Sequence, residues 1–136
     1  MSPADESKIE PGIEGTLERV VKPEWTLTYF DPKLPGVFST PSMIALMEMT
    51  TSHAIAPFLP PGALTVGTRI EVDHLRAVPA GVTAVSKAKL VEVNGRRLIF
   101  EVEVSSGGST IGRGFVHRAI VTHERFQGIV SGKQMK

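Results

Sequence analysis

The sequence predicts an α+β domain in which a curved antiparallel β-sheet wraps around one central helix. One long apolar segment, 40–59, carries helix signals at both ends. Four long segments after it alternate apolar and polar residues, and short turns rich in glycine or proline separate them. With 136 residues the chain can form one core, so we expect a single domain at 12–127, between a flexible arm at 1–11 and a polar tail at 128–136.

The composition excludes several classes of function. The formal net charge is +1, so no bulk field favours nucleic acid or an anionic membrane as a partner. The chain has no cysteine, which rules out disulfides, thiolate catalysis and thiolate metal ligands. No apolar run reaches membrane-spanning length, and the N-terminus lacks the pattern of a signal peptide. We therefore expect a cytoplasmic protein.

The residues before the helix predict two short extended segments. Residues 15–21 have strand character, and Lys22-Pro23 interrupts them. Residues 25–30 (WTLTYF) alternate and predict a second short strand or extended segment. The turn-forming dipeptides Asp31-Pro32 and Pro35-Gly36 then predict a loop, 31–36, before the helix.

The central helix is predicted to begin at Thr40-Pro41, with the threonine as N-cap and the proline at the first helical position. The segment is apolar on almost every side, which indicates a helix buried on most of its surface. Its titratable residues are Glu48 and His53, and His53 lies off the face of Glu48. A carboxylate within such a helix is costly unless something holds or uses it, so Glu48 is the first candidate functional residue.

The strand after the helix, 64–75, supplies the second candidate. From Thr68 onward, alternate residues are apolar on one face and charged on the other. His74 belongs to the apolar face together with Ile70 and Val72, so we expect its imidazole to point toward the helix. An inward imidazole can serve as an acid or base near neutral pH.

Three further strands complete the predicted sheet at 83–92, 97–105 and 110–121. Asn94-Gly95 predicts a two-residue hairpin, and a serine- and glycine-rich turn, 105–109, follows. On the last strand two glycines share a face with Arg118, which indicates close approach of another element. A sheet with one small helix leaves an edge or face uncovered, so we expect oligomerisation. The polar tail from Arg125 is expected to fray.

Four segments, in this order, resemble the hot-dog-fold acyl-CoA thioesterases, specifically the fluoroacetyl-CoA thioesterase-like branch. They are FSTPSMIALMEMTTSHAIAPFL, GTRIEVDHLRAVPAG, NGRRLIFEVEV and IGRGFVHRAIV, and the likeness extends over about 12–126. The resemblance implies a hot-dog fold and a homodimer. Whether two dimers pair further into a tetramer stays open. It also implies that acyl-CoA binds between the subunits. No metal or redox cofactor is expected, and coenzyme A is part of the substrate.

The resemblance also implies a set of site residues. Thr40, Glu48 and His74 occupy the positions of the family's catalytic threonine, glutamate and histidine. Gly67 matches a glycine beside the acyl group, and Arg118 matches an arginine near the same site.

The loop before the helix departs from the family pattern. It is shorter than the phenylalanine-bearing lid of the fluoroacetyl-specific enzyme, and its aromatic residues are Tyr29, Phe30 and Phe38. We place Phe38 among the substrate-binding residues. We therefore expect the family's reaction, hydrolysis of an acyl-CoA thioester, with a short or small acyl group, and we do not expect selectivity for a fluorinated one.

Thioester hydrolysis needs a nucleophile, a proton shuttle and donors for the developing oxyanion. Our hypothesis is that Glu48 and His74 perform the chemistry while Thr40 orients them. Glu48 either attacks the carbonyl carbon directly or activates a water molecule. Thr40 either donates a hydrogen bond or acts as the nucleophile with His74 as its base.

Each residue also has a purely structural interpretation. Thr40 would then only cap the helix, Glu48 would lie at a wet helix edge, and His74 would be a hydrogen-bonded core residue. Two other functions compete with hydrolysis. One is a hot-dog hydratase or dehydratase, although the aspartate–histidine helix motif typical of that class is absent from the sequence. The other is a non-catalytic domain that binds acyl-CoA.

Overall fold

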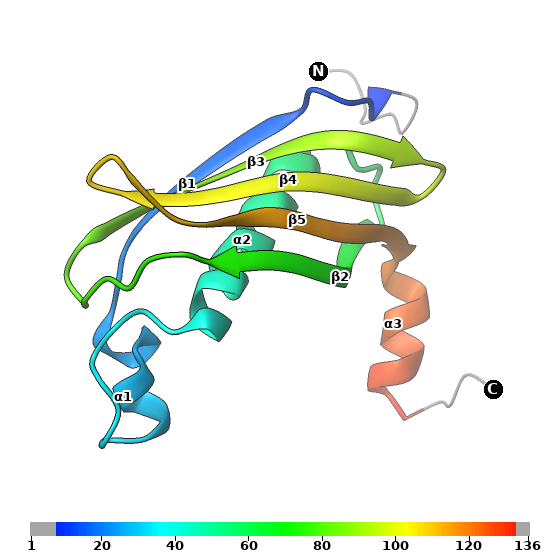
Figure 1. The fold of residues 1–136 in the computed structure, drawn as a ribbon. Coiled ribbons are helices and arrows are strands. Elements are labelled where there is room, and N and C mark those ends of the chain that lie inside the picture. Colours follow the sequence, from blue (N-terminus) through cyan, green and yellow to red (C-terminus); the bar gives the residue numbers. More distant parts are fainter. Residues whose placement is uncertain (1–7, 133–136) are drawn as a thin grey trace.

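The computed structural model describes residues 8–132, and in this range five strands form one antiparallel sheet. The strand order is β1-β3-β4-β5-β2 (Figure 1), and every neighbouring pair is antiparallel. The strands are β1 (Glu14–Val20), β2 (Ala63–His74), β3 (Thr83–Asn94), β4 (Arg97–Ser106) and β5 (Ser109–Thr122). The predicted architecture of one antiparallel sheet and one long helix is confirmed.

The long helix α2 (Thr40–Ile55) lies across one face of the sheet, and a short 3₁₀ turn, η3 (Ala56–Phe58), follows it (Figure 1). The helix therefore ends before the predicted Leu59. The predicted alternation of β3 and β4 is confirmed, since all the side chains assigned to their inner faces are buried. They are Ala84, Ser86, Ala88 and Leu90 on β3, and Leu98, Phe100, Val102 and Val104 on β4.

The close approach predicted from the glycines of β5 is also confirmed. A Cβ atom at Gly112 would collide with the side chain of Met43 on α2 and with the backbone of β2. The missing side chain therefore lets the helix lie close against this part of the sheet.

The N-terminus of α2 corrects one prediction. Ser39, not Thr40, is the N-cap: its Oγ accepts a hydrogen bond from the Ser42 N–H at 3.2 Å and lies 2.8 Å from the Ser42 hydroxyl. Thr40 is the first helical residue and Pro41 the second, positions where proline is also tolerated. The Thr40 hydroxyl is consequently free for another partner.

The prediction of a strand at 25–30 is wrong. The chain there forms the 3₁₀ turn η2 (Pro23–Trp25) and the short helix α1 (Leu27–Phe30), with one isolated β-bridge from Thr26 to Phe38. Pro23 starts the first turn, and the Thr26 hydroxyl donates to its carbonyl at 2.7 Å. Stacking of Trp25 on buried Phe38, with ring centroids 6.3 Å apart, fixes the segment and overrides its alternating pattern.

Both ends of the predicted domain differ from the expected flexible arm and fraying tail. In the predicted arm, 1–7 lie outside the described residues, whereas Ile9 is buried; just after the arm, the Gly12 N–H donates to the Leu90 carbonyl at 2.8 Å. At the other end α3 (His123–Val130) forms with Thr122 as its N-cap, so the tail expected to fray from Arg125 is helical as far as Val130, and its residues 133–136 lie outside the described residues. Figure 1 shows α3 extending away from the end of β5. No helix within 8–132 is long and apolar enough to span a membrane.

The sheet of the described chain ends in two edge strands, β1 and β2, and its helix α2 is partly exposed. β2 is an edge strand, so one side of its backbone has no neighbouring strand in the sheet. The helix α2, expected to be buried on most sides, exposes Ala45 and Met49, and Met49 is 46% accessible. An open sheet edge and an exposed apolar helix strip are both features that another protein chain can cover.

Candidate active site

Thr40 and His74 form the first polar pair of the candidate site. The Thr40 hydroxyl lies 2.7 Å from Nδ1 of His74, which is hydrogen-bond distance. Thr40 lies in the first turn of α2, and His74 is the last residue of β2. Because Ser39 caps the helix, the Thr40 side chain is free to orient the imidazole. The structural interpretation of Thr40 as a cap is therefore wrong.

The second ring nitrogen of His74 is buried and has no hydrogen-bond partner among the described residues. A buried polar atom without a partner is costly and needs an explanation. His74 and Thr40 line a hollow of about 260 Å³, together with Leu27, Val37, Phe38, Leu75, Arg76 and Ala77. Phe38, predicted to bind substrate, is thus a buried residue at this hollow, whereas Tyr29 and Phe30 are exposed and do not line it.

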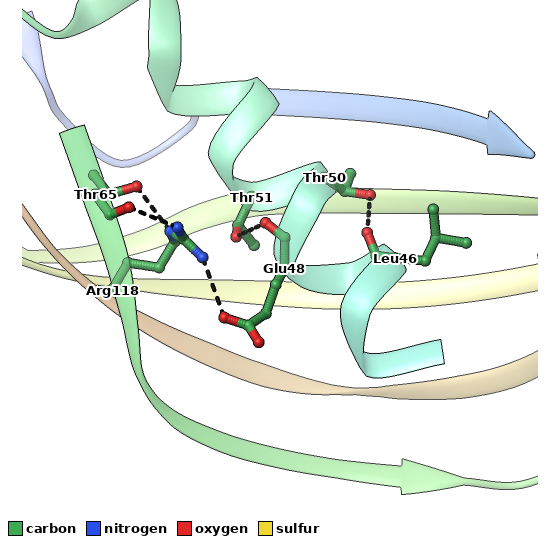
Figure 2. A network of polar contacts seen from close by, with 6 residues as sticks. All are labelled: Leu46, Glu48, Thr50, Thr51, Thr65 and Arg118. Atoms are coloured by element: carbon green, nitrogen blue, oxygen red, sulfur yellow. Dashed lines mark hydrogen bonds and ion pairs between the residues drawn. The ribbon is translucent and has the colours of Figure 1, made fainter. Parts of the chain in front are cut away.

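Glu48 and Arg118 form the second polar pair. Oε2 of Glu48 lies 3.4 Å from Nη1 of Arg118, and Figure 2 shows the two side chains facing each other between α2 and the sheet. The Arg118 side chain is 7% accessible and the Glu48 side chain 37% accessible. The carboxylate therefore has a fixed cation on one side and an open approach on the other.

Thr65 on β2 binds the other nitrogens of the same guanidinium. Arg118 Nε donates to the Thr65 hydroxyl at 2.8 Å, and Nη2 donates to the Thr65 carbonyl at 2.9 Å (Figure 2). Burial lowers the pKa of Arg118 below that of a free guanidinium, and the charge of Glu48 opposes this shift. Arginine remains a cation across the physiological range, so the pair is ionic whenever Glu48 is ionised.

Gly67 provides the space in which the Glu48 carboxylate lies. A Cβ atom at Gly67 would collide with Oε2 of Glu48 and would approach Nη1 of Arg118 to 3.8 Å. Gly67 pairs with Arg118 in the β2–β5 register, so glycine, arginine and glutamate converge from three elements. Gly67 was expected to lie beside the acyl group; in the structure the Glu48 side chain lies against it.

The two pairs do not meet within one chain. Glu48 lies two helical turns after Thr40, about 12 Å along the axis of α2. Their partners on β2, Gly67 and His74, lie roughly 20 Å apart along the strand. Glu48 does not line the hollow that holds His74. The hypothesis that both groups face one cavity is thus not met by the described chain alone.

Sequence reasoning missed Ser39 and Thr65. The role of Ser39 as N-cap could have been predicted from the sequence, since serine is as good an N-cap as threonine. Thr65 lies on β2 before the point at which the alternation becomes regular, so its face could not be assigned.

The sheet wrapped around α2, with hydroxyl, imidazole, carboxylate and guanidinium groups lying between the two layers, defines a hot-dog-fold enzyme of the thioesterase class. A family model described as fluoroacetyl-CoA-specific thioesterase matches residues 21–124. The fluoroacetyl-CoA thioesterase of Streptantibioticus cattleyicolor is 38% identical over 90% of this chain and 92% of its own length.

Solved structures agree with this comparison. The fluoroacetyl-CoA thioesterase FlK superimposes with a TM-score of 0.85 at 36% identity, covering 93% of this chain and 98% of the other. A thioesterase superfamily member from Thermus thermophilus superimposes with a TM-score of 0.83 at 27% identity, covering 90% and 91%. The chain belongs to the fluoroacetyl-CoA-specific thioesterase family.

Proposed function

We propose that the protein hydrolyses the thioester of a short or small acyl-CoA to the free acid and coenzyme A. Glu48 and His74 perform the chemistry in this proposal, and Thr40 orients His74. The observation that carries it is the 2.7 Å contact between Thr40 and His74 at the rim of a hollow, in a chain of this family.

The proposed reaction consumes one water molecule. Its oxygen bonds to the carbonyl carbon as Glu48 takes a proton from it, and the carbon–sulfur bond breaks as His74 delivers a proton to the leaving sulfur. Transfer of the proton from Glu48 to His74 then restores both groups. The backbone N–H of Thr40, at the positive end of the α2 dipole, favours the negative charge that develops on the carbonyl oxygen, whereas Ser39 accepts hydrogen bonds from the N–H groups of Ser42 and Met43. No metal or redox cofactor takes part in this proposal, so a chelator is expected to leave the rate unchanged.

A homodimer brings the two polar pairs together in our proposal. Within one chain Glu48 lies about two helical turns from Thr40, the partner of His74, whereas the groups of one reaction must lie within hydrogen-bond reach of the reacting atoms. The open edge of β2 and the exposed strip of α2 offer a surface on which a second copy can pack. We therefore propose that each catalytic site combines Glu48 of one protomer with Thr40 and His74 of the other, and that acyl-CoA binds between them.

Arg76 is the residue that we assign to the phosphates of coenzyme A. It follows β2, lines the hollow beside His74 and is exposed. Arg118 is not available for this role, because it is buried and its nitrogens contact Thr65 and Glu48. Lys22 is also less suited to this role, because its Nζ already contacts the Trp25 ring, 5.4 Å from the ring centroid. An arginine at the mouth of a site suits phosphate oxygens by both charge and geometry.

The test is release of free thiol from a panel of acyl-CoA thioesters, including acetyl-, fluoroacetyl- and longer acyl groups. We expect release with small acyl groups, and loss of release in both Glu48→Gln and His74→Ala. Hydration of an enoyl-CoA without thiol release would favour the hydratase alternative. Tight coenzyme A binding without turnover of any thioester would favour a binding domain.

A further inference from the structure

We propose that Thr65 is a positioning residue for the hydrolysis, which acts on Glu48 through Arg118. The inference rests on the proposed function, since it concerns the orientation of the carboxylate that the function uses. Thr65 does not contact Glu48: its hydroxyl and carbonyl both bind the guanidinium that does (Figure 2).

The geometry fixes the orientation of the guanidinium. Its three nitrogens are rigidly coplanar, and two of them donate to a hydroxyl and a carbonyl of the same residue, at 2.8 and 2.9 Å. The plane of the guanidinium is thereby set, and the remaining nitrogen, Nη1, points to Glu48. A lysine, or an arginine without the Thr65 hydroxyl, would supply the same charge without this orientation.

The surroundings make this orientation matter for Glu48. The backbone at Gly67 closes the other side of the carboxylate, because a single added carbon there would overlap Oε2. Arg118 is the charged group that contacts Glu48 within 8–132, and β2 presents only the neutral residues Thr65 and Gly67 to this network. A rotated guanidinium would therefore shift the carboxylate toward its open side and away from its productive position.

The experiment compares Thr65→Val with Thr65→Ser. Valine keeps the shape but leaves Arg118 Nε without a partner, so we expect kcat to fall about tenfold. We expect KM for acyl-CoA to stay within about twofold, because Thr65 is buried and in this proposal acts through Arg118 without contacting the substrate. Serine retains the hydroxyl and is expected to restore kcat to within about threefold of the unmodified enzyme.

Thr50→Val is the matched control. Thr50 is also a buried threonine, and its hydroxyl bonds the Leu46 carbonyl and the Ser86 hydroxyl at 2.7 Å, on the side of α2 away from Glu48 (Figure 2). We expect this variant to lose thermal stability to a similar extent while keeping kcat. A Thr65→Val enzyme with unchanged kcat, or a loss of kcat that Thr50→Val reproduces or Thr65→Ser does not rescue, would overturn the inference.

The outcome separates the inference from the function on which it rests. If the unmodified protein releases thiol, Glu48→Gln does not, and Thr65→Val behaves as the unmodified protein, the inference alone fails. If the unmodified protein releases no thiol from any acyl-CoA, the proposed function fails and the inference with it.

Discussion

The Thr40 hydroxyl lies 2.7 Å from Nδ1 of His74, and it is free to do so because the preceding residue, Ser39, caps the helix. Two adjacent hydroxyls at one helix start thus have different tasks. One satisfies the backbone of α2, and the other lies within hydrogen-bond distance of an imidazole at the end of β2.

This division of tasks predicts opposite effects of two neighbouring substitutions. Ser39→Ala is expected to lower the free energy of unfolding by about 1 kcal/mol, the usual cost of a lost cap. Thr40→Val is expected to lower kcat/KM at least tenfold while changing the free energy of unfolding by less than about 0.5 kcal/mol. Urea denaturation and thiol release measure the two effects. A reversed pattern, with Thr40 carrying the stability, would restore Thr40 as the cap.

The Glu48 carboxylate lies in the space that Gly67 leaves open. Gly67→Ala is expected to displace the carboxylate and to reduce kcat at least tenfold, because the added carbon overlaps Oε2 of Glu48. Gly128→Ala is the control, since a Cβ atom on this residue of α3 meets nothing within 4 Å. Steady-state kinetics of both variants test the prediction, which fails if both retain full kcat.

Arg76 is predicted to contribute to recognition of coenzyme A and not to the chemical step. Arg76→Glu is expected to raise KM for acyl-CoA about tenfold or more with little change in kcat, through loss of a charged contact. Acyl-pantetheine, which lacks the nucleotide phosphates, is expected to be hydrolysed equally well by both enzymes. Arg125→Glu, an exposed substitution on α3, controls for the change in net charge. Equal KM increases for both substrates would contradict the assignment.

The exposed strip of α2 is predicted to lie in the dimer interface. Met49→Glu places a charge on this apolar strip and is expected to shift the protein from dimer to monomer, because burying an unpaired charge is costly. Sedimentation measures the mass, and we expect thiol release to be lost with the dimer. An active monomer would show that the catalytic site is complete in one chain.

The regular parts of the fold could be predicted because their side chains follow a simple period. The inner faces of β3 and β4 follow strict alternation. Trp25 to Phe30 alternates equally well but forms no strand: Thr26 makes one β-bridge and Leu27–Phe30 is helical, because packing of Trp25 on Phe38 decides the conformation. Alternation alone does not reveal such a tertiary contact.

The candidate site depends on a feature that the sequence pattern hides. The β2–β5 register shifts between Gly67 and Arg69, so Thr68 is an extra residue at a β-bulge and is exposed, not inward as predicted. Without the bulge, Gly67 and His74 would lie on opposite faces of β2. Sequence similarity to the family marked both residues, but the period of the strand could not place both on the inner face.

The central claim is that one catalytic site uses Glu48 of one protomer and His74 of the other. The direct measurement is thiol release by a purified heterodimer of a Glu48→Gln protomer and a His74→Ala protomer, each inactive as a homodimer. A site shared between protomers leaves one of the two sites intact, so the heterodimer is expected to recover roughly half of the unmodified rate. A heterodimer as inactive as both homodimers would contradict the claim.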